Sequence, residues 1–285
     1  MASEPSSVLV TGCSSGIGKA TAKHLAERGW KVYASARRPE TIADLGEAGC
    51  ETLALDVTDE ASMDAAVKKV EEAEGSVGAL VNNAGYSQSG AIETVPLERV
   101  RAQFETNVFG LLRMCQLVLP GMRRAGKGRI VNVSSMGGRL VFPGGGAYHG
   151  TKYAVEALSD AMRFEVKGFG IDVVLIEPGL ITTEFGNVAA GSVDHTGTEE
   201  HQDAYADFNE KVATATKEVY EGPMRHLGGG PETVAKAIER ALGARRPKAR
   251  YVVTPSARLA LMQHRMLPAK GWDAVMRSQF PSPGR

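Results

Sequence analysis

Apolar and polar positions follow two alternating patterns along the chain. Short, mostly apolar runs are typical of buried strands in a parallel sheet, whereas longer segments with an apolar residue at every third or fourth position are typical of helices that cover such a sheet. The short runs predict strands at residues 8–10, 31–35, 51–55, 79–82, 129–134, 171–177 and 251–254. The longer segments predict helices at residues 16–28, 59–74, 97–122, 147–166 and 231–242.

The order of these elements predicts the fold class. Strands that alternate with helices form a doubly wound α/β fold, in which helices cover both faces of a parallel sheet, here a seven-stranded one. No linker divides the chain, so we expect a single domain over residues 1–285 with a flexible N-terminus at 1–6. Residues 184–230 have no strand pattern and predict a helical insertion on the substrate side. Residues 255–285 predict a C-terminal extension that is helical or irregular.

Composition and charge exclude several classes of protein. Hydrophobic residues make up 43% and charged residues 23%, which is ordinary for a globular protein. Lys plus Arg and Asp plus Glu both number 33, and this zero net charge argues against a nucleic-acid partner. No apolar run approaches the roughly 18 residues of a membrane-spanning helix, and the first residues lack the apolar core of a secretory signal. The isolated cysteines, Cys13, Cys50 and Cys115, predict free thiols and a cytoplasmic location.

A glycine-rich turn joins the first predicted strand to the first predicted helix. Residues 11–18 read TGCSSGIG, with glycines at Gly12, Gly16 and Gly18. Glycines let the backbone approach a pyrophosphate closely, and the free N–H groups at the start of a helix attract its negative charge. The turn therefore predicts a nucleotide-binding loop, and the alternative is a tight connection without a ligand.

The end of the second predicted strand bears on the cofactor. Proteins that bind NAD usually place Asp or Glu there to accept a hydrogen bond from the ribose 2′-hydroxyl. Here the neutral Ala36 is followed by Arg37 and Arg38, and a guanidinium can bind a 2′-phosphate. The sequence favours NADP (NADPH) over NAD, and the alternative is a pair of solvated arginines.

Tyr148 and Lys152 lie four residues apart near the start of a predicted helix, which places both on one face. A free tyrosine is a poor base at neutral pH, but a neighbouring cation lowers the pKa of its hydroxyl toward the range useful for proton transfer. The pair predicts a general acid/base, and the alternative is an exposed pair of helical neighbours.

Two further positions invite a functional interpretation. Ser134 and Ser135 end the fifth predicted strand, at the carboxyl edge where open α/β sheets bind ligands, although serine is also common in turns. Asn107 lies inside a predicted helix although asparagine is a weak helix former. We expect Asn107 to hold a water or to kink the helix, unless it is a buried amide that is satisfied by the protein.

Taken together, these motifs resemble the short-chain dehydrogenase/reductase family over about residues 6–185. The resemblance implies a Rossmann-like fold and hydride transfer between NADP and a ketone or alcohol, with no metal. The one departure is YHGTK, where Ala-Ser is more usual before Lys152, but Thr151 keeps the hydroxyl. The matching segments are TGCSSGIG at 11–18, LDV at 55–57, NNAG at 82–85, Asn107, VSS at 133–135, YHGTK at 148–152 and PGLITT at 178–183.

The resemblance also implies residue roles. Tyr148 would be the general acid/base, Lys152 would lower its pKa and bind the nicotinamide ribose, Ser135 would orient the carbonyl, and Asn107 would anchor a water of the proton relay. The cofactor-binding residues that it implies are Gly12, Ser14, Ser15, Gly16, Ile17, Gly18, Arg37, Asp56, Val57, Asn83, Ala84, Gly85, Tyr148, Lys152, Pro178, Gly179, Ile181 and Thr183.

Within the family, the chain resembles the branch of 17β-hydroxysteroid and retinol dehydrogenases, on GCSSGIG at 12–18, VYASARR at 32–38 and the long tail after 249–254. This implies a hydrophobic carbonyl or alcohol substrate, with steroids as one example, and a homodimer or homotetramer. We do not expect membrane contact, and we interpret His201, His226 and His264 as surface residues. A sensor or scaffold that binds NADP without turnover is the main alternative. A sugar-nucleotide epimerase is disfavoured by the glycine spacing.

Overall fold

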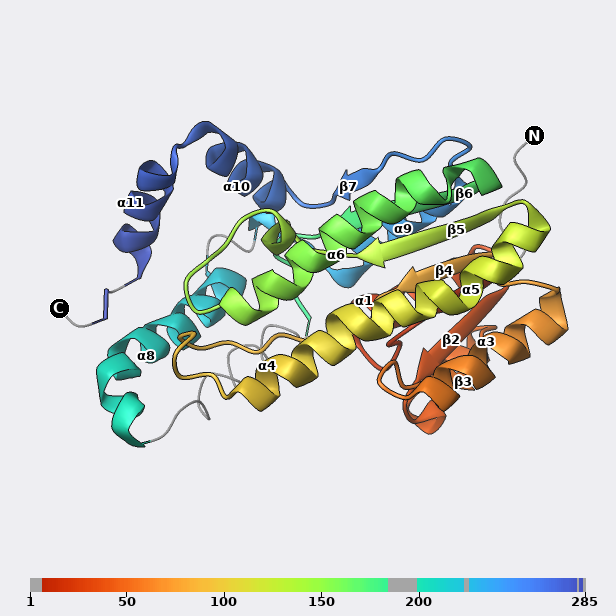
Figure 1. Cartoon of the computed structure of the whole chain (residues 1–285), viewed down its shortest axis with the longest axis horizontal. Helices are drawn as coiled ribbons and strands as arrows, with labels where there is room; N and C mark the ends of the chain where they lie inside the picture. Colours follow the sequence, from red (N-terminus) through yellow and green to blue (C-terminus); the bar gives the residue numbers. More distant parts are fainter. Residues whose placement is uncertain (1–6, 184–198, 223–225, 281, 284–285) are drawn as a thin grey trace.

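The computed structural model describes residues 7–183, 199–222, 226–280 and 282–283 (Figure 1). Its centre is a seven-stranded sheet in the order β3-β2-β1-β4-β5-β6-β7, in which all neighbouring strands run parallel. The predicted doubly wound α/β fold is thereby confirmed. The strands are β1 (Val8–Val10), β2 (Val32–Ala36), β3 (Glu51–Ala54), β4 (Ala79–Asn82), β5 (Gly128–Val133), β6 (Ile171–Glu177) and β7 (Arg250–Val252).

Helices pack on both faces of the sheet because strand side chains alternate between the faces. Leu9 and Leu80 point into a core covered by α3 (Glu60–Glu74), α5 (Leu111–Ala125) and α6 (Gly146–Glu165). Val8 and Val81 point into the opposite core, which is covered by α1 (Gly16–Glu27), α2 (Ala43–Glu47) and α9 (Pro231–Gly243). In Figure 1, α5 and α6 cross in front of the sheet.

The helix expected at 97–122 is interrupted. It consists of α4 (Leu97–Phe104), a π-helical turn η2 (Glu105–Gly110) and α5. Gly110 packs against the main chain of Val57, where a Cβ would come within 2.3 Å of the Val57 carbonyl oxygen. A π turn widens the helix by one residue per turn, so it changes the direction in which the Asn107 side chain points. The regular helical pattern is therefore interrupted at Asn107, and the expected kink stays a prediction.

The described parts of the substrate-side insertion and of the C-terminal extension are mostly helical, and Gly229 in the insertion forms an isolated parallel bridge with Ile181. α8 (Glu199–Glu221) lies in the insertion, and α10 (Pro255–Met266) and α11 (Ala269–Gln279) lie in the extension. Figure 1 shows α8 and α11 at the end of the molecule toward which β5 points. Within the described residues, no helix is both long and apolar enough to cross a membrane. The flexible N-terminus expected at 1–6, and the parts of the insertion at 184–198 and 223–225, lie outside the described residues. The boundaries of a single domain stay a prediction.

Candidate active site

A cavity of about 1060 Å³ lies at the carboxyl ends of the strands and gathers most of the predicted site residues. Gly18 and Asn107 are the two predicted residues that do not line it. Gly18 packs against the glycine-rich turn, where a Cβ would collide with the Gly12 carbonyl oxygen. Asn107 is buried in the protein interior. The predicted residues in the cavity wall are Gly12, Ser14, Ser15, Gly16, Ile17, Arg37, Asp56, Val57, Asn83, Ala84, Gly85, Ser135, Tyr148, Lys152, Pro178, Gly179, Ile181 and Thr183.

The glycine loop leaves backbone donors available at one end of this cavity. Gly12 and Gly16 adopt φ angles of 71° and 56°, and a Cβ on Gly12 would lie 2.8 Å from the Cα of Ala84. Ser15 is the N-cap of α1, yet its side chain makes no capping hydrogen bond and the first turn holds no acidic residue. The N–H groups at the start of α1 therefore keep the partial positive charge that attracts an anion.

Asn83 and Thr11 hold the glycine loop against the segment that follows β4. Thr11 Oγ1 accepts hydrogen bonds from the main-chain N–H groups of Asn83 at 3.0 Å and Ala84 at 3.1 Å. Asn83 Nδ2 donates to the carbonyl oxygens of Thr11 and Gly12, both at 3.0 Å. These bonds fix the narrow passage between the two segments. Thr11 belongs to the matching motif, but its side chain was not singled out from the sequence.

The neighbouring wall carries the groups expected near an adenosine. Ala36 and Arg37 line the cavity at the end of β2, and Arg37 is exposed. Among the described residues, no carboxylate forms an ion pair with Arg37. Asp56 is engaged within its own turn, because its Oδ1 accepts from the N–H of Thr58 at 2.9 Å and from the Thr58 hydroxyl at 2.8 Å. Arg38 is exposed but does not line the cavity.

Lys152 is buried beside Tyr148. Its Nζ donates to the carbonyl oxygen of Val133 at 2.9 Å and lies 5.8 Å from the centroid of the Tyr148 ring. Burial lowers the pKa of Lys152 to about 8, while the negative charge of Glu156 acts in the opposite direction. The ammonium hydrogens that do not bond Val133 remain for a ligand in the cavity. In its charged form, Lys152 favours loss of a proton from the neighbouring phenol.

Ser135 is oriented by the short helix that follows β5. It is the N-cap of η3 (Met136–Gly138), and its Oγ accepts a hydrogen bond from the Gly137 N–H at 3.0 Å. Because this bond uses a lone pair of the oxygen, the hydroxyl hydrogen can still be donated to a carbonyl in the cavity. Ser134 is more deeply buried than Ser135 but also reaches the cavity wall.

Asn107 ties the π turn to the Tyr148 helix. Its Oδ1 accepts from the Tyr86 N–H at 3.1 Å, and its Nδ2 donates to the Tyr86 carbonyl at 2.9 Å and to Thr151 Oγ1 at 3.1 Å. Thr151 Oγ1 in turn donates to the Tyr148 carbonyl at 2.7 Å. Both amide hydrogens of Asn107 are therefore used by the protein, as in the alternative of a satisfied buried amide.

Sequence reasoning did not find three side chains that support the site. His149 Nδ1 lies 3.0 Å from the Gly137 carbonyl, and Nε2 accepts the Phe142 N–H at 3.3 Å, so the proton sits on Nδ1. Thr254 Oγ1 accepts from the Gly179 N–H at 3.1 Å, and Ser256 Oγ accepts from the Leu180 N–H at 3.2 Å. Thr254 is also the N-cap of α10, and no sequence pattern pointed to its contact with this loop.

Part of the cavity wall is made of apolar side chains. Phe142 and Pro143 contribute from the segment before α6, Val212 and Ala215 from α8, and Phe280 from the end of α11. Phe280 also packs against the small core that Val212 forms under α8. The insertion and the C-terminal extension therefore meet over the same end of the cavity.

Residues 6–191 match the sequence model of the family described as short chain dehydrogenase. Among curated proteins, the 3-ketodihydrosphingosine reductase of Bacteroides thetaiotaomicron is 35% identical over 94% of this chain and 93% of its own length. The NADPH-dependent 3-dehydrocapnine reductase of Ornithobacterium rhinotracheale is 38% identical over 91% and 93%. Human 17-beta-hydroxysteroid dehydrogenase type 1 is 36% identical over 87% and 77%.

The fold is similar to solved structures over nearly its whole length. A short-chain dehydrogenase from Streptomyces avermitilis superposes with a TM-score of 0.76 and 34% sequence identity, covering 95% of this chain and 98% of that one. The likeness therefore includes the parts of the chain beyond residue 191, which the family's sequence model does not reach.

Proposed function

The chain belongs to the short-chain dehydrogenase/reductase family of oxidoreductases, which act on alcohol and carbonyl groups with a nicotinamide cofactor, and we propose that it is an NADPH-dependent ketone reductase with a hydrophobic substrate. One observation carries the proposal. Ser135, Tyr148 and Lys152 line one cavity together with a glycine loop that has available N–H groups and with a group of apolar side chains.

The residues present fit an NADP molecule. The cradle at Gly12 has no room for a Cβ, and the N–H groups that begin α1 suit a pyrophosphate. Arg37 suits a 2′-phosphate, and Ala36 leaves no carboxylate to repel it. Lys152 would hold the nicotinamide ribose, and the loop at 178–183 would hold the carboxamide. The printed name of the Ornithobacterium relative specifies NADPH, which supports the same choice.

In the proposed reaction, the bound nicotinamide supplies the hydride that reduces the carbonyl carbon. Ser135 donates its hydroxyl hydrogen to the carbonyl oxygen and fixes its position. Tyr148 then gives its proton to the oxygen as negative charge develops there. Lys152, held by the Val133 carbonyl, stabilises the tyrosinate that this transfer leaves behind.

The proton that Tyr148 loses must be replaced from solvent. The side chain of Asn107 has already donated both amide hydrogens within the protein. The π turn η2 departs from the usual helical hydrogen-bond pattern and contacts α6 through the Asn107–Thr151 hydrogen bond, so we assign the relay water to the backbone of this turn. Asn107 would then shape that turn rather than bind the water through its amide.

The substrate class follows from the apolar wall made by Phe142, Val212 and Phe280. Apolar walls with few polar groups select for hydrophobic surface. The names of the two bacterial reductases specify a 3-keto and a 3-dehydro compound, and the human relative is named for a steroid. We therefore propose 3-ketodihydrosphingosine as the first substrate to test and a 17-ketosteroid as the second.

The test is consumption of NADPH by the purified protein with these two ketones, each compared with a small aromatic ketone and with NADH. Turnover that favours a large apolar ketone and NADPH supports the proposal. Saturable binding of NADPH without turnover of any ketone would contradict the reductase and favour the sensor or scaffold.

We also propose a homodimer or homotetramer built on the face of η2 and α6. Phe109 is 52% exposed, Tyr153 42% and Phe164 89%, which is unusual for aromatic side chains without a partner. Light scattering of the purified protein tests this, and a monomer at micromolar concentration would contradict it. The three cysteines are free and buried, which supports a reducing compartment such as the cytoplasm.

A further inference from the structure

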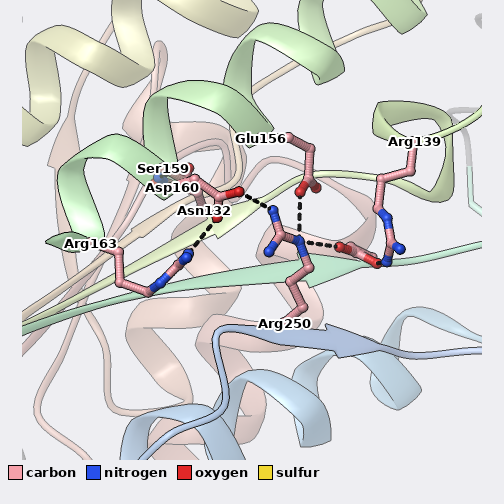
Figure 2. Close-up of polar contacts among 8 residues, drawn as sticks. Asn132, Arg139, Glu156, Ser159, Asp160, Arg163 and Arg250 are labelled. Atoms are coloured by element: carbon pink, nitrogen blue, oxygen red, sulfur yellow. Dashed lines mark hydrogen bonds and ion pairs between the residues drawn. The ribbon is translucent and has the colours of Figure 1, made fainter.

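Arg250 lies among three carboxylates next to the catalytic cavity (Figure 2). Its Nε is 3.0 Å from Glu156 Oε2 and 3.0 Å from Glu177 Oε1, and its Nη2 is 2.6 Å from Asp160 Oδ2. Arg139 adds a contact of 3.1 Å to the other oxygen of Glu177. Figure 2 shows the Arg250 side chain reaching from β7 to the carboxylates of Glu156 and Asp160 on α6.

Burial of a carboxylate without a nearby cation raises the free energy of the folded state, and two of these three carboxylates are buried. The Glu177 side chain is fully buried and that of Glu156 is 8% exposed. Burial raises the pKa of Glu156, and the charge of Glu177 adds to this, whereas the Ser134 hydroxyl and Arg250 lower it. Arg250 is the cation that contacts both of these buried carboxylates, and Arg139 is a second cation for Glu177, so removal of Arg250 would leave Glu156 in the protein interior without an ion-pair partner among the described residues.

The two buried carboxylates belong to the two segments that form the reaction centre. Glu156 lies one helical turn after Lys152 on α6, and Glu177 directly precedes the loop at 178–183. The chain that follows Arg250 also holds this loop, because Thr254 and Ser256 accept its N–H groups. Gly138 packs tightly against Ser134 and Glu156, because a Cβ on Gly138 would come within 2.9 Å of both side chains.

We propose that Arg250 is a positioning residue: it holds the helix that carries Tyr148 and Lys152 against the nicotinamide loop, and it keeps the Glu156 charge beside Lys152. The inference rests on the proposed function, because it takes Lys152 and the loop at 178–183 to serve the reaction. It also predicts an effect on NADPH binding, which can be measured whether or not a ketone is turned over.

The negative charge of Glu156 affects the pKa of Lys152 in one direction. Burial lowers the pKa of Lys152 and the negative charge of Glu156 raises it. The charged groups facing Glu156 are Lys152 and Asp160 on α6, Glu177 at the end of β6 and Arg250 on β7. When Glu156 is neutralised, the pKa of Lys152 falls. As the pH is raised, Lys152 therefore loses its proton, and the activity declines, at a lower pH than in the wild type.

The first experiment compares Arg250→Met with Arg163→Met. Arg163 lies on α6 and forms an ion pair with Asp160, as Arg250 does, but Arg163 has no contact with Glu156 or Glu177. We expect Arg250→Met to weaken NADPH binding and to lower kcat by roughly tenfold to a hundredfold, which is the effect of small displacements in a reaction centre. Arg163→Met should stay within about twofold of the wild type, as expected of a surface pair. Arg250→Lys should recover part of the loss.

A second variant keeps the inference falsifiable if Arg250→Met fails to fold. Glu156→Gln preserves the shape of the side chain and removes its charge, so the alkaline limit of kcat/KM should move to lower pH. The inference is overturned if folded Glu156→Gln, or folded Arg250→Met, loses thermal stability but keeps the wild-type pH profile and NADPH affinity. A wild type that binds NADPH but reduces no ketone would refute the proposed function instead, and the NADPH affinities of the variants would still decide the role of Arg250.

Discussion

Replacing Arg37 tests the cofactor assignment at a single side chain. Arg37 lines the cavity where β2 ends, is exposed to solvent, and has no ion-pair partner among the described residues. A guanidinium about 4 Å from a phosphate charge is worth about 1 kcal/mol at the dielectric of water and about 4 kcal/mol at the effective value near a protein surface. An intermediate value of about 2 kcal/mol corresponds to roughly 30-fold in affinity.

We therefore expect Arg37→Gln to weaken NADPH binding by roughly 30-fold and to leave NADH within about twofold, because NADH has no 2′-phosphate. Arg37→Asp should weaken NADPH further through repulsion. The matched control is Arg38→Gln, since Arg38 is also exposed but does not line the cavity.

The assay is quenching of protein fluorescence by each cofactor at two ionic strengths. The preference for NADPH should narrow as salt rises, because screening shortens the range of the interaction from about 10 Å at 0.1 M to about 3 Å at 1 M. Equal loss of NADPH and NADH affinity in Arg37→Gln would refute the reasoning, and so would an equal effect of Arg38→Gln.

Three further predictions concern the loop, the wall and the pH dependence. Thr254→Val leaves the N–H groups of Gly179 and Ala257 without their acceptor, so we expect urea unfolding to show a loss of about 2 kcal/mol or more together with a higher KM for NADPH. An unchanged KM would count against the role of Thr254. Phe280→Ala should lower kcat/KM for a long-chain ketone roughly tenfold more than for a small aromatic one; equal losses would remove Phe280 from the substrate wall. Because the pKa of Lys152 is about 8, its positive charge is lost as pH rises through that value, and kcat/KM should fall there. A profile that stays level far above pH 8 would contradict this.

The strands and the glycine loop were predictable because their causes are local. The strands predicted at 79–82 and 171–177 coincide with β4 and β6 residue for residue. The glycine loop at 11–18 comes directly after the first strand in the sequence. Asn107 gave a local signal as a weak helix former. The π turn ends at Gly110, which meets Val57, and a helical pattern cannot reveal such a contact between distant parts of the chain.

The supports of the site were not predictable for the same reason. Thr254 and Ser256 bind a loop about 75 residues earlier, and Arg250 pairs with Glu156 94 residues earlier. Such pairings are set by the crossover that places β7 beside β6. His149 precedes Gly150 and Thr151, the two positions at which the motif departs from the family pattern, and no sequence signal pointed to His149 itself. Its two ring nitrogens bond the segment between Ser135 and Tyr148, and it is part of the cavity wall.

The most direct test of the central claim compares wild type with Tyr148→Phe in NADPH-dependent reduction of 3-ketodihydrosphingosine. Phe keeps the ring and removes the hydroxyl that would give up the proton. We predict turnover by the wild type, and for Tyr148→Phe a similar NADPH affinity with a kcat lower by at least about a hundredfold. Turnover by Tyr148→Phe at a rate close to that of the wild type would contradict the assignment of the acid, and with it the mechanism proposed for this cavity.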